Sequence, residues 1–491
     1  MLLYIRFFAR VLIMPYLGDI DLLNHTFILG VFNPVALISS NNHAHTNLSQ
    51  SKKMRPYSRM APPNSTTLII GAAGAIGKRL CAALSQQGTR VIASDRMEHL
   101  PGSLKRDLGP TSLSVGNVDV RDKESLRQLF HDHADEHTTV WNLAAPLSVE
   151  TAMDPEVAAA VTVGGMENVL EAMTEVGARR ICFTDSIGSF GASAPRSGAT
   201  ARWLIENPTQ DPGSDYGVQK RGCRELMERF ATEKGGDPRF AVLPGVLHSE
   251  PIWGNGTTEY ALDALIAASQ GTPYSCPIEL DVQLPMIFVD DLMNALLSLQ
   301  NADENTLGEP QHGYCVPGLS FSPNELFCEI RKYYPTFEVS VDLDENMNKF
   351  AHLWPNNLSL MEPKRDLGYA PKVGLPEMVK TVLNAHTTRQ QRHVSVFESL
   401  DVDGNGFVDR AEMEKYIRKH MVEGRESGGY VFRRQDSVGI ILNKTMEELD
   451  TNNDGLISLP TFQEWSRHNS IKGMVSEHTE EMIRRSPSRK K

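Results

Sequence analysis

The chain has 491 residues and a formal net charge of -12 at pH 7. This length exceeds that of one small domain, and 41% hydrophobic residues suffice for two or three folded units with their own cores. The negative charge argues against nucleic acid as the main partner. Six cysteines without C-x-x-C or metal-ligand spacing fit a reducing compartment better than a disulfide framework.

Residues 1–65 differ from everything that follows them. The first 18 residues carry Arg6, Arg10 and no acidic residue, and such an amphipathic start is typical of a mitochondrial or other organellar presequence. We therefore expect a presequence or a disordered leader. A start codon placed too far upstream is the alternative reading of this segment, and a cytoplasmic location is the alternative to an organelle. Polar residues interrupt the second apolar run, so no stable membrane span is expected.

A glycine-rich stretch at 67–80 organises the next domain. Its apolar start, 68–70, predicts a buried parallel strand, and 76–87 has helical spacing. The glycines between them suit a tight turn, a close approach to a pyrophosphate, and close packing of the helix on the strand. The residues expected at the pyrophosphate are Gly71, Gly74, Ala75, Ile76 and Gly77.

A second predicted strand, 90–94, ends on Asp95, which follows Gly71 by 24 residues. From this position a carboxylate accepts from the ribose 2′-hydroxyl and repels a 2′-phosphate. The order strand, loop, helix, strand and acid therefore predicts NAD rather than NADP. A glycine turn in an unrelated α/β unit is the alternative reading.

Alternating strands and helices continue after Asp95, with further strands predicted at 113–118, 139–143 and 180–184. This alternation predicts a doubly wound parallel sheet of the Rossmann type, which binds its ligands at the carboxyl edge. One long helix is expected at 155–175. The residues expected at the adenine and at the second ribose are Asp119, Val120, Leu143, Ala144 and Ala145.

Tyr216 and Lys220 form the second chemical pattern, at the start of a predicted helix. Positions i and i+4 share a helix face, so the Lys220 ammonium is expected beside the Tyr216 phenol, where its charge favours the phenolate. Ser186, thirty residues before Tyr216, ends a strand and is placed to hold the same substrate oxygen. We predict that all three are catalytic. Tyr216 takes a hydroxyl proton as hydride leaves for the nicotinamide, and both Tyr216 and Lys220 contact the cofactor.

The glycine-rich loop, Asp95, Ser186, Tyr216 and Lys220 resemble an extended short-chain dehydrogenase/reductase of the NAD-dependent epimerase/dehydratase superfamily. Later segments resemble the short-chain type of L-threonine 3-dehydrogenase, namely 255–261, 284–291, 319–323, and 353–355 with the following 365–369. The resemblance runs from about 67 to 386 and implies NAD-dependent oxidation of a small 3-hydroxy acid. It also implies a substrate pocket formed by Ser148, Ser186, Tyr216, and Thr257 or Thr258. Trp354 is either a wall of this pocket or a core residue.

Two positions depart from the pattern of that family. Val242 stands in place of an arginine that is a candidate partner of the substrate carboxylate, and an apolar side chain cannot pair with a carboxylate. Thr162 stands in place of an asparagine that orders the proton relay. The sequence therefore leaves three functions open: a dehydrogenase for a hydroxy acid or an amino acid such as L-threonine, an epimerase or dehydratase for nucleotide sugars, and a calcium sensor with a non-catalytic nucleotide-binding domain.

The segment 401–412 fits the twelve-residue calcium loop, with Gly406 at the sharp bend and helical patterns on both sides. Calcium is a hard cation that takes six to eight oxygen ligands. The expected ligands are Asp401, Asp403, Asn405, the carbonyl of Phe407, Asp409 and both oxygens of Glu412.

A second loop at 450–461 keeps the early ligands, but Thr461 replaces the bidentate carboxylate, so weak binding is expected. Val408 and Ile457, at matching loop positions, are placed to form a short ladder between the loops. Both loops resemble the EF-hand family, whose paired lobes buffer calcium or open an apolar groove. The candidate ligands of the second loop are Asp450, Asn452, Asp454, Leu456 and Ser458.

These patterns together predict an α/β NAD-binding domain followed by an all-α calcium-binding pair. The expected partners are a small-molecule substrate and calcium, and a homodimer is one candidate for the oligomeric state. The expected boundaries are a leader at 1–65, the NAD-binding domain at 66–386 with its substrate lobe mainly at 246–386, a linker at 387–393, the EF-hand pair at 394–475 and a basic tail at 476–491.

Overall fold

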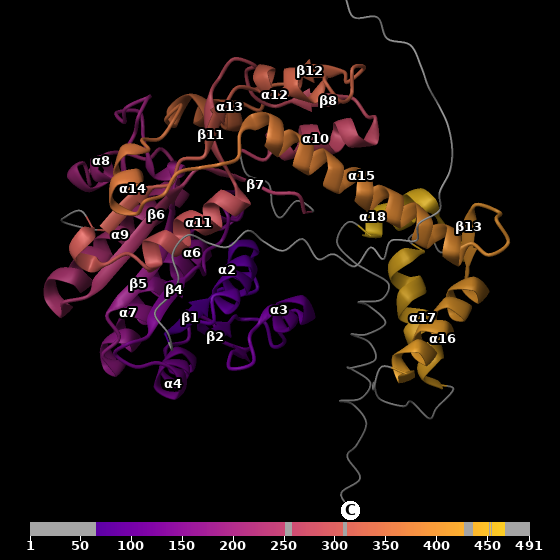
Figure 1. Cartoon of the computed structure of the whole chain (residues 1–491), viewed down its shortest axis with the longest axis horizontal. Helices are drawn as coiled ribbons and strands as arrows, with labels where there is room; N and C mark the ends of the chain where they lie inside the picture. The colour runs from indigo at the N-terminus through magenta and orange to yellow at the C-terminus, as the bar shows by residue number, and fades with distance from the viewer. Residues whose placement is uncertain are drawn as a thin grey trace, which may run out of the picture. The chain divides into compact units, whose positions relative to one another are not determined.

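The structure is a computed structural model, and it describes residues 65–250, 258–307, 312–426, 436–450, 452 and 454–466 (Figure 1). The predicted leader, apart from Ser65, and the predicted basic tail lie outside these residues. Among the described residues, every helix is too short or too polar to cross a bilayer.

A seven-stranded sheet forms the centre of the first domain, with strand order β10-β6-β5-β4-β1-β2-β3. Every neighbouring pair in it is parallel. The order reverses between β1 and β4, which is the point where such sheets bind ligands. The predicted doubly wound parallel sheet is confirmed. The strands are β1 (Thr66–Ile70), β2 (Arg90–Ser94), β3 (Leu113–Val115), β4 (Thr139–Asn142), β5 (Arg180–Ser186), β6 (Asp237–Leu243) and β10 (His312–Cys315).

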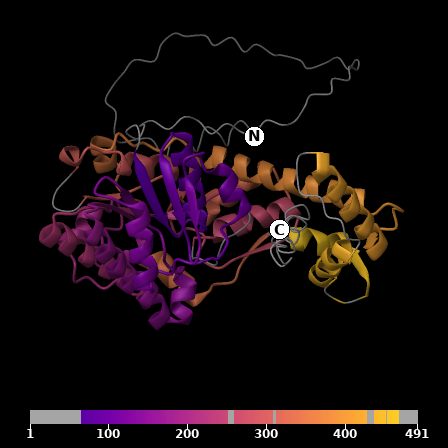
Figure 2. The same ribbon diagram turned by 90° about the horizontal axis from the view of Figure 1, so that it is seen from below.

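Helices cover both faces of this sheet, as the view turned by 90° shows (Figure 2). Alternating side chains of β1 enter two separate cores, because successive residues of a strand point to opposite faces. Leu68 and Ile70 pack in one core and Ile69 in the other. The first core takes side chains from α4 (Lys123–His133), α7 (Gly165–Val176) and α9 (Asp215–Lys234). The second takes them from α2 (Ala75–Gln86), α3 (Gly102–Asp107) and α11 (Val289–Gln300).

The helix predicted at 155–175 is divided in the structure. It consists of α6 (Pro155–Ala159), a π-helical turn (Ala160–Gly164) and α7, with α5 (Ser148–Met153) before it. Thr162 lies in the π-helical turn, and its carbonyl accepts a hydrogen bond from the Cys223 thiol on α9 at 3.4 Å. Such turns insert one extra residue into a helix and occur often at functional sites.

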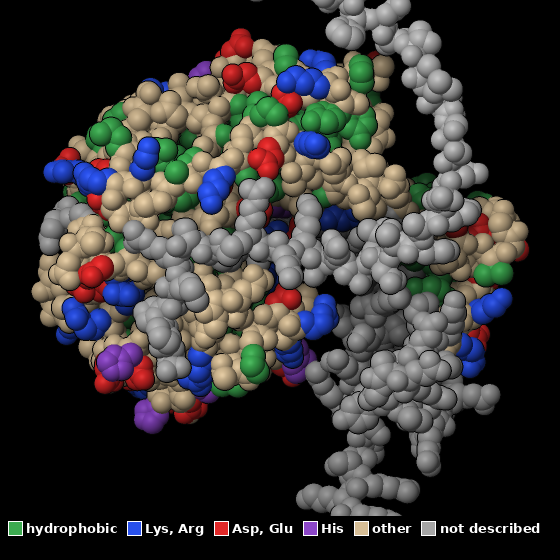
Figure 3. All heavy atoms as spheres, viewed as in Figure 1, with side chains coloured by type: hydrophobic (Ala, Val, Ile, Leu, Met, Phe, Trp, Pro, Cys, Tyr) green, Lys and Arg blue, Asp and Glu red, His purple; other side chains and the backbone are tan. Residues whose placement is uncertain are grey.

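Two small sheets and several helices form the substrate lobe over a third core. One sheet joins β7 (Gly245–Leu247), β9 (Leu284–Phe288) and β11 (Leu319–Phe321), and the other joins β8 (Tyr274–Cys276) and β12 (Val339–Val341). Charged side chains of both signs are interspersed on the face of the protein seen in Figure 3. The helices of this part are α10 (Tyr260–Gln270), α12 (Pro323–Ile330), α13 (Glu345–Leu353) and α14 (Met361–Asp366), and α8 (Ala201–Glu206) precedes α9.

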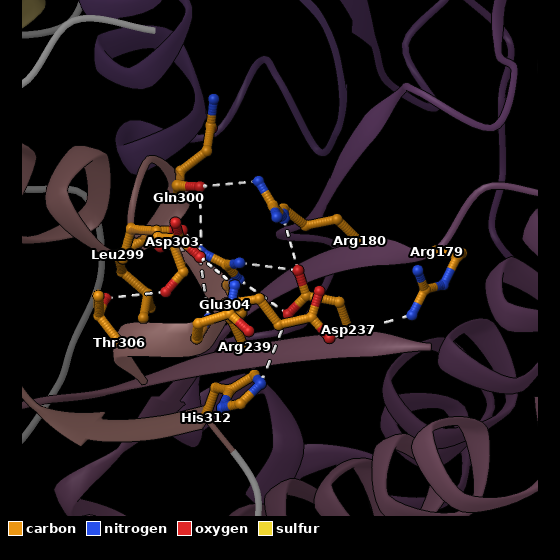
Figure 4. Close-up of polar contacts among 12 residues, drawn as sticks. Arg179, Arg180, Asp237, Arg239, Leu299, Gln300, Asp303, Glu304, Thr306 and His312 are labelled. Carbon is orange, nitrogen blue, oxygen red and sulfur yellow. Dashed lines mark hydrogen bonds and ion pairs between the residues drawn. The ribbon is translucent and has the colours of Figure 1, made fainter. Parts of the chain in front are cut away.

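A buried ionic cluster lies at the amino edge of the main sheet (Figure 4). Arg239 forms two hydrogen bonds to Asp237, of 2.9 and 2.7 Å, and also binds the carbonyls of Leu299 and Ala302 at the end of α11. Burial raises the pKa of Asp237, but the hydrogen bonds and charges of Arg239 and Arg180 outweigh it and hold the pKa below its usual value. The cluster therefore anchors α11 to the sheet, on the edge opposite the glycine-rich loop.

The C-terminal part begins within α15 (Leu375–Leu400). The sequence analysis predicts a linker at 387–393, and this prediction is wrong, because one continuous helix runs through that segment. Its first half packs in the core of the substrate lobe and its end packs in a fourth core. That fourth core also takes side chains from α16 (Arg410–Glu426), α17 (Asp436–Leu449) and α18 (Leu459–Ser466).

Candidate functional site

The glycine-rich loop joins β1 to α2 in a conformation that needs its glycines. Gly71 has a φ of +83°, and a Cβ there would lie 2.9 Å from the carbonyl carbon of Leu143. A Cβ at Gly77 would lie 2.4 Å from the oxygen of Gly71, so α2 packs directly on the loop. Gly74 is the N-cap residue of α2 and offers no side chain to the free N–H groups of the first turn. These N–H groups and the helix dipole fit a pyrophosphate.

Asp95 follows β2 and lies beside this loop. One of its carboxylate oxygens accepts a hydrogen bond from Ala73 N–H at 3.0 Å, and the other accepts from Met97 N–H at 3.3 Å. The carboxylate is therefore held next to the phosphate-binding turn, where the ribose of a dinucleotide lies in such folds. Its position fits the predicted preference for NAD.

The residues predicted at the adenine and the second ribose follow β3 and β4. Asp119 forms hydrogen bonds of 3.0 and 2.6 Å with the Arg121 side chain, which hold the pKa of Asp119 below its usual value. Val120 is buried, and a Cβ at Gly165 would lie 2.6 Å from it. Leu143, Ala144 and Ala145 come directly after β4 and are half-buried, and Ser148 begins α5.

Ser186 and Tyr216 flank one glycine at the carboxyl end of β5. Ser186 Oγ accepts a hydrogen bond from Gly188 N–H at 3.1 Å. A Cβ at Gly188 would lie 3.5 Å from Ser186 Oγ and 3.3 Å from the Tyr216 ring. The first turn of α9 packs equally closely, since a Cβ at Gly217 would lie 2.2 Å from the Gly188 carbonyl oxygen. The structure thus brings the serine hydroxyl and the phenol ring together.

Lys220 lies under the same phenol ring. Its side chain is 3% exposed, and its Nζ is 5.3 Å from the centroid of the Tyr216 ring and 4.6 Å from that of Phe183. The ammonium also donates a hydrogen bond to the Thr184 carbonyl at 2.9 Å. A buried cation next to a half-buried phenol and a serine hydroxyl can bind and deprotonate a substrate hydroxyl.

A buried ion pair beside these residues was not predicted from the sequence. Arg224 on α9 pairs with Asp185 on β5, and both side chains are buried. Arg224 follows Lys220 by four residues, as Lys220 follows Tyr216. The sequence signal for this ion pair is the spacing of four residues between three polar side chains on one helix that packs against the sheet.

The two departures from the family pattern both lie in the interior. Val242 is fully buried in the first core and pairs in register with Asp185 of β5. Thr162 is 4% exposed.

Among the remaining predicted substrate residues, Thr257 lies outside the described residues. Thr258 lies next to Gly245, where an added Cβ would be 2.6 Å from the Thr258 Cβ.

Trp354 packs against both the first core and the core of the substrate lobe. Its ring stacks on Phe350 with 5.6 Å between the ring centroids. Its Nε1 atom is buried and has no hydrogen-bond partner among the described residues. The tryptophan therefore joins the two lobes and keeps one donor for which the described part of the chain supplies no acceptor.

The first calcium loop brings carboxylates together as predicted. Oxygens of Asp401, Asp403 and Glu412 lie within 4.8 Å of one another, a spacing that could hold a metal ion. Gly406 has a φ of +85°, as the bend in this loop requires. The donor set consists of hard oxygens and fits calcium.

The second loop lacks the last carboxylate. The Thr461 hydroxyl is hydrogen-bonded to Ser458 Oγ at 2.8 Å. Strands β13 (Phe407–Asp409) and β14 (Leu456–Ser458) pair antiparallel, and Val408 lies opposite Ile457. The predicted ladder between the two loops is therefore confirmed.

Comparison with known proteins gives two family matches. The family described as "NAD dependent epimerase/dehydratase family" matches residues 67–310, and the EF-hand domain pair matches residues 390–467. Bovine (Bos taurus) mitochondrial L-threonine 3-dehydrogenase is 30% identical over 329 residues, which cover 65% of this chain and 82% of the relative. An uncharacterised epimerase/dehydratase of Staphylococcus aureus is 31% identical over 321 residues, or 65% of this chain and 95% of the relative.

The chain belongs to the NAD-dependent epimerase/dehydratase family. Among solved structures, the holo form of the L-threonine dehydrogenase from Cupriavidus necator matches with a TM-score of 0.57 and 28% identity, over 65% of this chain and 99% of that chain. The predictions of an NAD-dependent dehydrogenase domain and of an EF-hand pair that binds calcium are confirmed.

Proposed function

We propose that this chain oxidises a small 3-hydroxy acid or an amino acid such as L-threonine at its hydroxyl carbon. NAD, when bound, accepts the hydride from that carbon. The observation that carries the proposal is the convergence of Ser186, Tyr216 and buried Lys220 at the carboxyl end of β5. The names of the bovine and Cupriavidus relatives support the substrate class.

Each of the three side chains has one role in the proposed reaction. Ser186 Oγ accepts from Gly188 N–H, so its own O–H remains available to donate to the substrate oxygen. Tyr216 takes the hydroxyl proton as the C–H bond breaks, which leaves a ketone. Lys220 places its positive charge 5.3 Å from the centroid of the Tyr216 ring and would hold the nicotinamide ribose. In this role Tyr216 touches both substrate and cofactor.

A nucleotide-sugar epimerase or dehydratase is the second candidate, and Val242 favours it. The family arginine that could bind a substrate carboxylate is replaced here by a buried apolar side chain. Arg224, the nearby cation, is paired with Asp185 and is not available to a carboxylate. A substrate whose recognition does not depend on a carboxylate at this point is consistent with Val242.

NADH formation separates the two enzymes from each other and from a non-catalytic sensor. The purified chain is mixed with NAD and a panel of hydroxy acids, amino acids and nucleotide sugars, and absorbance is followed at about 340 nm, where the reduced nicotinamide absorbs. A dehydrogenase accumulates NADH, whereas an epimerase converts a nucleotide sugar without free NADH. Tyr216→Phe must abolish turnover on each accepted substrate. Unchanged turnover in this variant contradicts the proposed mechanism.

We also propose a mitochondrial location. Its support is the acid-free N-terminal segment with Arg6 and Arg10, together with the mitochondrial L-threonine 3-dehydrogenases among the relatives. A fusion of residues 1–65 to a fluorescent protein should reach mitochondria, and the same fusion with both arginines changed to glutamate should not. A wild-type fusion that stays in the cytoplasm contradicts this location.

A further inference from the structure

Two buried aspartate–arginine pairs lie at opposite ends of strands β5 and β6. Asp237 and Arg239 form the pair at the amino end (Figure 4). Asp185 and Arg224 form the pair at the carboxyl end. The side chains of all four are at most 5% exposed. The same chemistry thus occurs twice, once far from the candidate active site and once beside it.

A buried ion pair is weak support for stability by itself. The cost of removing two charges from water offsets most of the attraction between them. Replacement of the pair by apolar side chains of similar volume therefore often leaves stability unchanged. Removal of one partner alone is far more damaging, because it leaves an unpaired charge in the interior. The function of each pair must therefore be sought in the groups that it holds in place.

The pair at the carboxyl end holds the tip of β5. One oxygen of Asp185, Oδ1, accepts from Ser186 N–H at 2.8 Å and from Ser189 Oγ at 2.5 Å. The other oxygen, Oδ2, accepts from Arg224 Nη1, which also donates to Ser189 Oγ at 3.0 Å. One carboxylate therefore fixes the backbone of Ser186 on one side and helix α9 on the other.

Helix α9 presents Tyr216, Lys220 and Arg224 at intervals of four residues, which places them along one face. Lys220 binds the Thr184 carbonyl and Arg224 binds the Asp185 carboxylate. The helix is thus attached to β5 at two successive residues, directly before Ser186.

The neighbouring strand β6 offers no charge to Asp185 at this point. The residue of β6 in register with Asp185 is Val242, which is apolar and buried. The cation that neutralises the carboxylate comes from α9 instead. The helix that carries Tyr216 and Lys220 is therefore itself tied to the strand that carries Ser186.

We propose that Arg224 is a positioning residue of the dehydrogenase site. Through Asp185 it sets the distance between Ser186 on β5 and Tyr216 on α9, the two side chains that hold the same substrate oxygen. This inference rests on the proposed function. Because a misplacement of about 1 Å can slow a reaction by about a hundredfold, loss of the pair should reduce kcat more than it weakens binding.

The test compares two matched double variants of the full chain. Asp185→Leu with Arg224→Met removes the pair at the carboxyl end. Asp237→Leu with Arg239→Met removes the pair at the amino end, where Arg180, whose side chain is 33% exposed, also loses its bond to Asp237. Both replace equally buried charges with apolar side chains. The measurements are kcat, the KM for NAD, the primary deuterium isotope effect on kcat, and amide hydrogen exchange along β5.

The first variant should lower kcat by about tenfold or more, leave the KM for NAD within about twofold, and raise the isotope effect because hydride transfer becomes slower. Amide exchange at 186–188 should become about tenfold faster. The control variant should keep the kcat and the exchange at 186–188 of the wild type. Wild-type kcat and exchange in the first variant, or an equal fall of kcat in the control, overturn the proposal.

Arg224→Lys covers the case in which the first double variant does not fold. It keeps the charge but loses the planar guanidinium, so kcat should fall while the KM for NAD stays. Wild-type kcat together with wild-type exchange at 186–188 in this variant also overturns the proposal. If the wild-type chain reduces NAD with no substrate of the panel, the proposed function fails, and the exchange measurements alone decide whether the pair holds the tip of β5.

Discussion

The two EF-hand loops should differ sharply in calcium affinity, and the difference should depend on one side chain. In the first loop, carboxylate oxygens of Asp401, Asp403 and Glu412 lie within 4.8 Å of one another. Each pair of charges at this separation repels by about 0.9 kcal/mol at the dielectric constant of water and by about 3.5 kcal/mol at an effective value of 20. Calcium relieves this repulsion. The second loop has Thr461 in place of the last carboxylate.

Calorimetric titration of the apo protein should therefore show one tight site per chain. Glu412→Gln should weaken that site by about a hundredfold, or about 2.7 kcal/mol, because it removes one charge and one bidentate ligand. Calcium at about 100 times its Kd stabilises the folded pair by about 2.7 kcal/mol, which raises its midpoint of thermal unfolding by about 10–20 °C. Glu412→Gln should abolish most of this rise.

Thr461 supplies the matched variants. Thr461→Ala should leave the single tight site unchanged, whereas Thr461→Glu should create a second site, because it restores the missing carboxylate at the twelfth position. Two tight sites in the wild type, or an unchanged affinity in Glu412→Gln, would refute the assignment of ligands to these loops.

Three further predictions concern the dehydrogenase domain. Cys328 is exposed, whereas the other five cysteines are buried. Burial raises the pKa of Cys81, Cys182 and Cys223 to about 12. A thiol reagent at pH 8 should therefore label one cysteine in the native protein and six after denaturation. Asp95→Ala should lower kcat/KM for NAD by about tenfold or more and raise kcat/KM for NADP. The variant loses the carboxylate that accepts from the ribose 2′-hydroxyl of NAD and repels the 2′-phosphate of NADP. Burial lowers the pKa of His248 and of His386 to about 4. Between about pH 6.5 and 4 these histidines are protonated in the unfolded chain but not in the folded chain. The free energy of unfolding should therefore fall by up to about 3 kcal/mol per histidine as the pH drops through this window. Urea unfolding at pH 7 and 4.5 checks this fall, and His386→Leu should reduce it.

The strands of the nucleotide-binding half could be predicted from the sequence because their signals are local. Strand β2 occupies 90–94 in both the prediction and the structure, since a short apolar run between turn residues specifies a buried strand. The first calcium loop was equally clear, because its ligands lie within twelve residues. In these regions each residue's role depends on neighbours close in the chain.

Features that depend on distant segments were not predicted. The partner of Arg224 lies 39 residues away, and only the register of α9 against β5 brings the two together. The π-helical turn at 160–164 packs against α9, a contact that the helical spacing of the sequence does not encode. The segment 387–393 has the polar composition of a linker, yet it contains no glycine or proline, and the absence of both was the overlooked signal for a continuous helix.

That continuous helix connects the core of the substrate lobe to the core of the EF-hand pair. Met378 and Val382 of α15 pack in the core of this lobe, and Phe397 and Leu400 pack in the EF-hand core directly before the first ligand. Between them, Arg389 Nη2 donates to the Ser249 carbonyl at 3.2 Å, just after β7. Calcium changes the enzyme only if it binds two enzyme states with different affinities, and α15 is the element that connects the calcium loop to the substrate lobe.

The helix therefore predicts that calcium changes kcat/KM for the substrate by about fivefold or more, which corresponds to a coupling free energy of about 1 kcal/mol. Gln391→Pro should kink α15 between the two cores and remove this effect, while calcium binding at 401–412 persists in calorimetry. Gln391→Ala, at the same exposed position, is the matched control and should keep the effect. Identical kinetic constants with calcium and with chelator in the wild type contradict the coupling and make the EF-hand pair a calcium buffer that shares a helix with the enzyme.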